Sequence, residues 1–293
     1  MTGNLRIGQA HLPRAIWTGV FILAVSIVLS FWWPFQAERL VPAAQSVVLV
    51  LLSFACGYID ASLGMGYGST LTPLLLLLGY QPLEVVPAII ASQFSAGGIA
   101  AWAHHLIGNV DLNPRNRAFR VACLLASTSV LGTSIGALVA ICLPALYLQA
   151  WVGLLVCAIG IVTIALNRRH FPFSWKRILT LGIFAAFNKG STGGGYGPVV
   201  MGGQLLAGVS GKNAVGITTL AESLSCIVGV ATYLFSPGDV RWHLAPFLIV
   251  GAVAAVPFST FTVAALRPHL LKGAIGILTF TLGLLILLKV FVF

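Results

Sequence analysis

Long apolar runs, separated by short polar or glycine-rich breaks, most limit what this chain can fold into. The runs lie at about residues 16–33, 41–63, 66–79, 83–107, 118–142, 146–166, 178–193, 195–208, 212–235, 243–266 and 270–292. Most of them approach the roughly 20 residues that an α-helix needs to cross a bilayer. Only 8% of the residues are charged, against about 25% in a soluble domain, so polar side chains cannot cover a water-exposed globule. The sequence therefore predicts an all-α polytopic membrane protein.

The first apolar run has two interpretations. Arg14 precedes it, as a basic residue precedes the apolar stretch of a secretory signal peptide. The run ends in Trp32-Trp33-Pro34, however, and not in the small residues of a cleavage site. We therefore expect an extra N-terminal transmembrane helix that is retained.

The net charge of +10 raises the question of a nucleic-acid partner, but the basic residues flank apolar runs and form no patch. With the N-terminus in the cytoplasm, twelve Lys and Arg residues fall on the cytoplasmic side and three on the other. This bias follows the positive-inside rule for membrane proteins. We therefore expect a bacterial inner-membrane protein in contact with lipid, and no nucleic-acid partner.

Two glycine-rich segments repeat one another. The first reads GYIDASLGMGYGSTLTPLLLLLGY from Gly57, and the second reads AFNKGSTGGGYGPVVMGGQLLAG from Ala186. When Tyr67 is aligned with Tyr196, Gln93 falls opposite Glu222. Each copy has an odd number of crossings, so the second copy enters the membrane from the opposite side, as in many secondary transporters. The alternative is a symmetric bundle that duplication produced without a transport role.

This repeat divides the chain into four regions. They are a cytoplasmic N-terminus with one transmembrane helix (1–40), a first inverted repeat (41–167), a basic cytoplasmic linker (168–177) and a second inverted repeat (178–293).

The glycine-rich breaks predict a binding site for an anion. Glycine is unfavourable inside a helix, and unpaired backbone groups are costly in lipid. We therefore expect a broken or re-entrant half-helix after each break, with the electropositive N-terminus of each available to an anion. The expected substrate-binding residues are Ser62, Gly66, Tyr67, Gly68, Ser69, Gln93, Lys189, Ser191, Thr192, Gly195, Tyr196 and Gly197. Two alternatives are that the glycines only allow close helix packing, or that GYG forms a channel filter, which requires four copies in one orientation.

Three ionisable residues fall at depth within apolar runs, where a charge is costly and indicates function. Asp60 and Lys189 occupy the same repeat position, so the repeat axis could bring them face to face, either as a structural ion pair or with Asp60 as a resting counter-ion. Glu222 could carry a coupling proton or simply bind Ser and Thr hydroxyls. We expect His104 and His105 to be interfacial.

Signatures of enzymes and metal sites are absent from the sequence. There is no Ser/His/Asp constellation, HExxH or Walker loop, and the five cysteines lie in apolar segments without ligand spacing. We expect neither catalytic residues, metal nor cofactor.

Over about residues 41–292, the chain resembles the sulfite exporter TauE/SafE family of membrane permeases. The resemblance rests on the two segments quoted above and on the Gly-Asn/Asp-Val turn that follows each copy. Tyr67 and Tyr196 stand where the family often has another glycine. The resemblance implies ion-gradient-driven transport of sulfite, sulfoacetate or related organosulfonates.

Taken together, these features predict a secondary transporter that moves small sulfur-containing anions by alternating access and exports them. The alternatives are a permease for another small organic anion, such as a carboxylate, and an anion channel. The sequence is also compatible with a homodimer.

Overall fold

The structure is a computed structural model that describes residues 42–165, 175–206, 209, 211–236, 238–262 and 268–291. The predicted first membrane helix at 16–33, the whole N-terminal region (1–40) and most of the linker (168–177) lie outside the described residues.

All regular secondary structure in the described ranges is helical. The helices are α2 (Ala43–Leu63), α3 (Tyr67–Leu77), α4 (Pro82–Leu106), α5 (Arg117–Cys142), α6 (Ala145–Ala165), α7 (Trp175–Thr192), α8 (Tyr196–Leu206), α9 (Gly211–Phe235), α10 (Ala245–Thr262) and α11 (Pro268–Phe291). Each coincides with one predicted apolar run. Five of them, namely α2, α4, α5, α6 and α9, are long and apolar enough to cross a membrane.

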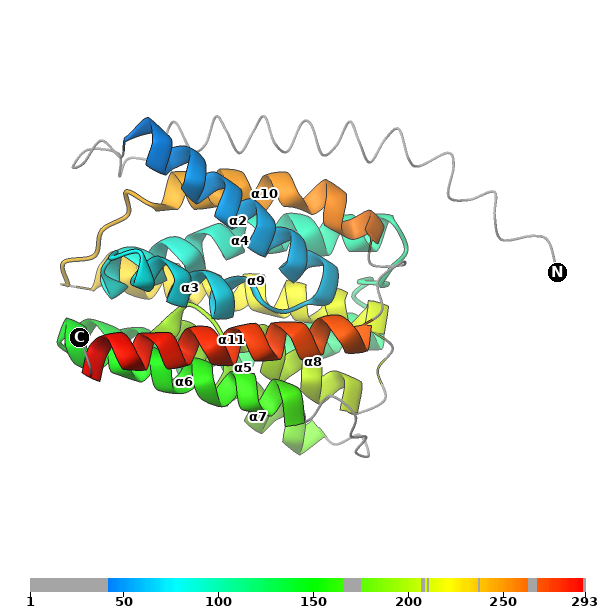
Figure 1. Cartoon of the computed structure of the whole chain (residues 1–293). Coiled ribbons are helices and arrows are strands. Elements are labelled where there is room, and N and C mark those ends of the chain that lie inside the picture. The colour runs from blue at the N-terminus through cyan, green and yellow to red at the C-terminus, as the bar shows by residue number, and fades with distance from the viewer. Residues whose placement is uncertain are drawn as a thin grey trace.

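The helices run along a common direction and pack as an elongated bundle (Figure 1). α4 and α9 cross antiparallel at its centre, with Ser223 donating to the Phe94 carbonyl at 2.9 Å. α2 lies beside α10, α5 beside α7, and α6 beside α11. The outer surface carries many large apolar side chains, including Leu131 (69% exposed) and Phe235 (88%). Such a surface suits lipid better than water.

Small residues allow the outer pairs to approach closely. A side chain at Gly57 of α2 would lie 3.1 Å from the Cα of Ala252 in α10. A side chain at Gly132 of α5 would lie 2.6 Å from the Ile183 carbonyl oxygen in α7. Close backbone approach through Gly and Ala is how membrane helices gain packing energy, because burial in lipid provides little hydrophobic driving force.

The short helices α3 and α8 are each the returning arm of a hairpin. α2 and α4 begin at the same end of the bundle, and α3 ends there too, since only residues 78–81 separate it from α4. At that end the Lys289 ammonium of α11 donates to the Leu76 carbonyl, the last turn of α3, at 2.9 Å. α7 and α8 form the corresponding hairpin at the opposite end, where α9 begins. At about 1.5 Å per residue, each short helix is about 16 Å long, which is too short to cross a bilayer core of about 30 Å.

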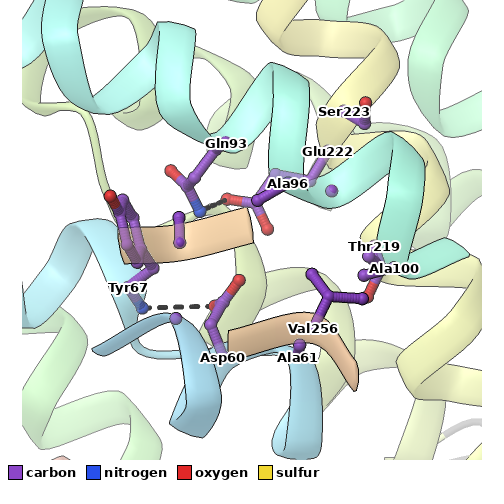
Figure 2. Close-up of a pocket in the computed structure, with 13 residues that line it drawn as sticks. Asp60, Ala61, Tyr67, Gln93, Ala96, Ala100, Thr219, Glu222, Ser223 and Val256 are labelled. Carbon is purple, nitrogen blue, oxygen red and sulfur yellow. Dashed lines mark hydrogen bonds between the residues drawn. The ribbon is translucent and has the colours of Figure 1, made fainter. Parts of the chain in front are cut away.

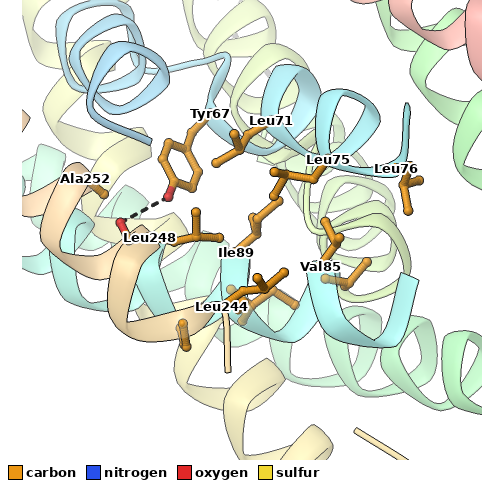
Figure 3. Packing of buried hydrophobic residues seen from close by; sticks show 14 of the residues in the cluster. Tyr67, Leu71, Leu75, Leu76, Val85, Ile89, Leu244, Leu248 and Ala252 are labelled. Carbon is orange, nitrogen blue, oxygen red and sulfur yellow. Dashed lines mark hydrogen bonds between the residues drawn. The ribbon is translucent and has the colours of Figure 1, made fainter. Parts of the chain in front are cut away.

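α3 is enclosed by apolar side chains. Leu71 and Leu75 are fully buried and pack with Ile89 of α4 and with Leu248 of α10 in one cluster (Figure 3). On its other side, the Thr72 hydroxyl donates to the Thr192 carbonyl at the end of α7 at 2.8 Å. This packing fixes both hairpins against each other.

Candidate functional site

Each hairpin turns at glycines whose backbone conformation disfavours other residues. Gly64 (φ 69°) ends α2 and Gly66 (φ 122°) precedes α3; Gly193 (φ 73°) ends α7 and Gly195 (φ 81°) precedes α8. These positive φ values are readily adopted only by glycine. The Gly64 amide donates to the Asp60 carbonyl at 2.6 Å, and the Gly193 amide to the Lys189 carbonyl at 2.9 Å. The two breaks are therefore built alike, and both predicted interruptions occur.

The two breaks touch each other, backbone against backbone. A Cβ on Gly68 would collide with the Gly193 carbonyl oxygen. A Cβ on Gly197 would lie 2.6 Å from the Gly64 carbonyl oxygen and 2.8 Å from the Cα of Met65. At Gly68 and Gly197, therefore, glycine is needed for close packing, the alternative that the sequence left open.

Most of the hydroxyls that we expected to bind substrate are engaged by the protein. Ser191 donates to the Phe187 carbonyl at 3.0 Å, and Thr192 to the Asn188 carbonyl at 2.8 Å. Ser62 donates to the Ser259 carbonyl at 3.5 Å. Ser69 is buried, and its hydroxyl has no hydrogen-bond partner among the described residues.

The two repeat tyrosines direct their hydroxyls into the core. The Tyr67 hydroxyl shares hydrogen bonds with the hydroxyls of Ser53 (2.8 Å) and Ser92 (2.7 Å). The Tyr196 hydroxyl accepts from Ser129 at 3.4 Å. Both side chains are at most 1% exposed. The structure thus gives the hydroxyls of these two expected substrate-binding residues a place in the interhelical packing.

Lys189 lies at the α4–α9 crossing and is completely buried. Its ammonium donates to Glu222 Oε1 at 2.8 Å and also to Gln93 Oε1. Gln93 Nε2 donates to the same Glu222 oxygen at 3.0 Å, which closes the network. The lysine therefore forms its ion pair with Glu222. Asp60, which the repeat could have brought face to face with it, acts on the lysine electrostatically, and the structure shows no ion pair between the two.

The side chain of Asp60, a residue of α2, lies at the N-terminus of α3. Its Oδ1 accepts a hydrogen bond from the Tyr67 backbone amide, the first of the helix, at 3.2 Å. A carboxylate at this position is stabilised by the helix dipole. The electropositive end of α3, which we expected to hold a substrate anion, thus carries a carboxylate of the chain itself.

A cavity lies between α2, α4, α9 and α10, with Asp60 on one wall and Gln93 and Glu222 on another (Figure 2). It measures about 20 Å³, enough for about one water molecule. Its full lining is Gly57, Asp60, Ala61, Tyr67, Gln93, Ala96, Gly97, Ala100, Thr219, Glu222, Ser223, Ala252 and Val256. Four predicted residues (Asp60, Tyr67, Gln93 and Glu222) thus meet there, and Lys189 contacts two of them from behind.

Sequence reasoning missed the small residues that make room for this cavity. Ala96, Gly97 and Ala100 of α4 recur on one face at the spacing of a helix turn. That spacing was available in the sequence as a signal of close approach by another helix.

Two buried donors that we did not select bind the helix ends next to the breaks. His104, which we expected at the interface, is fully buried, and its Nε2 lies 2.9 Å from the Ala61 carbonyl oxygen in the last turn of α2. The Tyr233 hydroxyl donates to the Gly190 carbonyl in the last turn of α7 at 2.7 Å. The last carbonyls of a helix have no partner within it, so these side chains satisfy groups that each break leaves open.

Residues able to hold a metal ion do not gather in the portion of the chain that the structure describes: no three His, Cys, Asp or Glu side chains are close enough together. All five cysteines are free thiols.

Comparison with known proteins identifies the family. Residues 48–286 match the sequence profile of the sulfite exporter TauE/SafE family. The chain is 27% identical over 242 residues to a probable membrane transporter protein, YtnM, of Bacillus subtilis (strain 168), and the match covers 78% of each chain. No solved structure matches the chain significantly. With its apolar helices and paired glycine breaks, the chain belongs to the TauE/SafE family of membrane transporters.

Proposed function

We propose that the protein is a secondary carrier of small sulfur-containing anions, such as sulfite and sulfoacetate, in the bacterial inner membrane. The observation that carries the proposal is Lys189, a fully buried ammonium beside the cavity in a chain of this family. A buried cation attracts an anion strongly, because water does not screen it. Lys189 contacts Gln93 and Glu222, which line the cavity, so an incoming sulfonate or sulfite would share the ammonium with these side chains.

Contacts between equivalent residues support the inverted repeat that the proposal includes. Tyr67 and Tyr196 are 129 residues apart, and the same separation joins Gln93 to Glu222, which are hydrogen-bonded across the α4–α9 crossing. A twofold axis that passes through this crossing would relate Gln93 to Glu222 and would place these equivalent residues next to each other. It also exchanges the contact between Gly68 and Gly193 with that between Gly197 and Gly64.

The helix-end contacts follow the same exchange. His104 and Tyr233 are equivalent positions, and so are the residues whose carbonyls they bind, Ala61 and Gly190. The packing of the helices is consistent with this symmetry. α2 packs against α10 in the same way as its equivalent α7 packs against α5, the equivalent of α10. These contacts favour two copies, α2–α6 and α7–α11, that enter from opposite ends of the bundle.

Alternating access is supported by the size and position of the cavity. A sulfonate group is larger than the single water that about 20 Å³ can hold, so binding needs an opening movement. Asp60 lines the cavity, whereas Lys189, the equivalent residue of the second copy, is completely buried. We propose that transport exchanges the two arrangements, closing the space beside Asp60 and opening one beside Lys189.

The distribution of basic residues favours one orientation in the membrane. Arg115, Arg117, Arg120 and Lys212 lie at the end of the bundle where α5 and α9 begin. At the other end, Arg241 is paired with Glu84 and Lys289 caps α3. The positive-inside rule favours the first end as the cytoplasmic one. We propose that flux is outward and coupled to an ion gradient.

The test is anion flux in proteoliposomes that contain the purified full chain. We expect saturable transport of labelled sulfite or sulfoacetate that unlabelled substrate suppresses and that Lys189→Met abolishes. Lys212→Met, at an exposed lysine, is the matched control and should transport normally. Flux that does not saturate would indicate a channel, and suppression by carboxylates alone would indicate a different cargo.

A further inference from the structure

The charges at the cavity do not cancel. Lys189 and Glu222 form a pair with an N–O distance of 2.8 Å and side chains that are 0% and 8% exposed. This pair is neutral as a unit. Asp60 also acts electrostatically on both members, and no second ammonium or guanidinium group contacts it among the described residues. One carboxylate at the cavity is therefore left without a cation of its own.

The two carboxylates differ in how they are held. Glu222 receives the Lys189 ammonium and the Gln93 amide, and it is only 6% exposed. Asp60 receives the Tyr67 backbone amide and interacts with the Gln93 amide across the cavity, but it has no cation of its own and is only partly buried. Both carboxylates line the cavity, which accommodates about one water, but only Glu222 is fixed by the lysine.

Within the part of the chain that the structure describes, Lys189 and Glu222 are the charged groups that act on Asp60. The groups that act on it are Lys189 from α7, Glu222 and the Cys226 thiol from α9, the Tyr67 phenol from α3, and the Cys56 thiol from its own helix. α4 contributes the neutral Gln93, and α10 contributes Ala252 and Val256. An ionised Asp60 therefore opposes any anion that enters the cavity, and a proton is the smallest ligand that removes this opposition.

Resting on the proposed function, we infer that Asp60 is the site where a coupling proton binds, while Glu222 remains the fixed counter-ion of Lys189. The proton adds to a carboxylate oxygen of Asp60 and leaves with the anion, so the two move together. Sulfoacetate with one proton carries one net negative charge, so an inside-negative membrane potential drives the outward movement. An anion at the N-terminus of α3 takes the place that the Asp60 side chain holds in this structure. Intramembrane carboxylates serve proton pathways in other transporters.

Infrared spectroscopy tests proton binding without any substrate. The chain has only six Asp and Glu residues, so a carboxylic-acid C=O band is simple to assign. Between about pH 8 and about pH 5.5, a range above the usual values for exposed carboxylates, we expect the folded protein to gain one such band. Asp60→Asn should remove it, whereas Glu222→Gln and the exposed control Asp111→Asn should keep it.

A band that persists in Asp60→Asn, or disappears in Glu222→Gln, would overturn the assignment. If Asp60→Asn does not fold, Asp60→Glu serves instead, because it must shift the frequency of the band; an unshifted band would equally overturn the assignment.

Binding of sulfoacetate tests the coupling. Both of its acid groups stay ionised over this range, so any pH dependence arises in the protein. We expect the wild-type Kd to rise about tenfold per pH unit in the alkaline half of the range, as uptake of one proton requires. Asp60→Asn should bind with a Kd independent of pH, and Glu222→Gln should keep the slope. Absence of binding to sulfite, sulfoacetate or thiosulfate at every pH would refute the proposed cargo, while the infrared band still decides the role of Asp60.

Discussion

The pairing of Lys189 with Glu222 makes a quantitative prediction about stability. Both side chains are buried, and each is the ionic partner of the other. Lys189→Met keeps the length of the side chain but leaves Glu222 without its cation, with only the Gln93 amide as a donor. Removing one member of a buried ion pair typically costs about 3–5 kcal/mol. We expect each single variant, Lys189→Met or Glu222→Gln, to lose about that much.

The double variant behaves differently. With both charges gone, the site holds a thioether and two amides, and replacing a whole buried pair is often neutral. We therefore expect Lys189→Met combined with Glu222→Gln to be more stable than either single variant. Thermal unfolding in detergent micelles, followed by circular dichroism, measures this; about 3 kcal/mol corresponds to a decrease in Tm of about 6–12 °C.

A matched cycle on the exposed pair of Arg241 and Asp239 provides the comparison. Its N–O distance is similar, at 3.1 Å, but its side chains are 38% and 82% exposed. Water and salt screen such a pair, so its coupling energy should be about 1 kcal/mol or less. If the losses of the two buried single variants simply add in the double variant, Lys189 and Glu222 are energetically independent and the reasoning is wrong.

Three further predictions concern the hairpins. Tyr233→Phe leaves a buried carbonyl of α7 without its donor and should lower the free energy of unfolding by about 1–3 kcal/mol, whereas Tyr147→Phe, at a side chain 65% exposed, should have no measurable effect in the same unfolding assay. Gly68→Ala should strongly reduce the yield of monodisperse protein in size-exclusion chromatography, because the added Cβ would meet the backbone of the other break. Gly98→Ala should be tolerated, because the atom nearest to its added Cβ would be the Ser223 hydroxyl oxygen at 3.3 Å. Lys289→Met removes the charged donor at the C-terminus of α3, which should cost about 0.3–1 kcal/mol; hydrogen exchange at the last turn of α3 should become faster, and an unchanged rate would show that this contact does not stabilise the turn.

Much of the fold was predictable because it follows from local rules. Apolar runs give the helices, and the glycines at 64, 66, 193 and 195 adopt positive φ values that end one helix and begin the next. The length of the short helices also follows from the sequence, and with it the return of each hairpin to the end where it started.

The partner of Lys189 was not predictable from the repeat alignment alone. Equivalent residues touch only where they lie near the axis that relates the copies. Gln93 and Glu222, at the α4–α9 crossing, meet this condition and are hydrogen-bonded. Asp60 and Lys189 lie on α2 and α7, outside the central pair, and the lysine forms its ion pair with Glu222.

His104 shows a second limit of sequence reasoning. Its position near the end of α4 suggested an interface, but the chain after the helix folds back over it, and Asn109 donates to His104 Nδ1 at 3.1 Å. The same amide donates to the Thr260 carbonyl of α10 at 3.2 Å. Burial here depends on a long-range contact between α4 and α10, which no local pattern in either segment encodes.

The difference between the two copies is as informative as their likeness. If position 189 carried an aspartate, as its equivalent position 60 does, three carboxylates would meet around one small cavity without a cation. The lysine neutralises the carboxylate at the axis and leaves one, Asp60, whose charge can change. The two copies therefore have matching backbone turns but opposite charges at the equivalent positions 60 and 189. The lysine forms a fixed ion pair with Glu222, and the aspartate is the group to which we assign the proton. A carrier that moves an anion together with a proton needs both, since a cation must hold the anion and a carboxylate must release the proton independently of that cation.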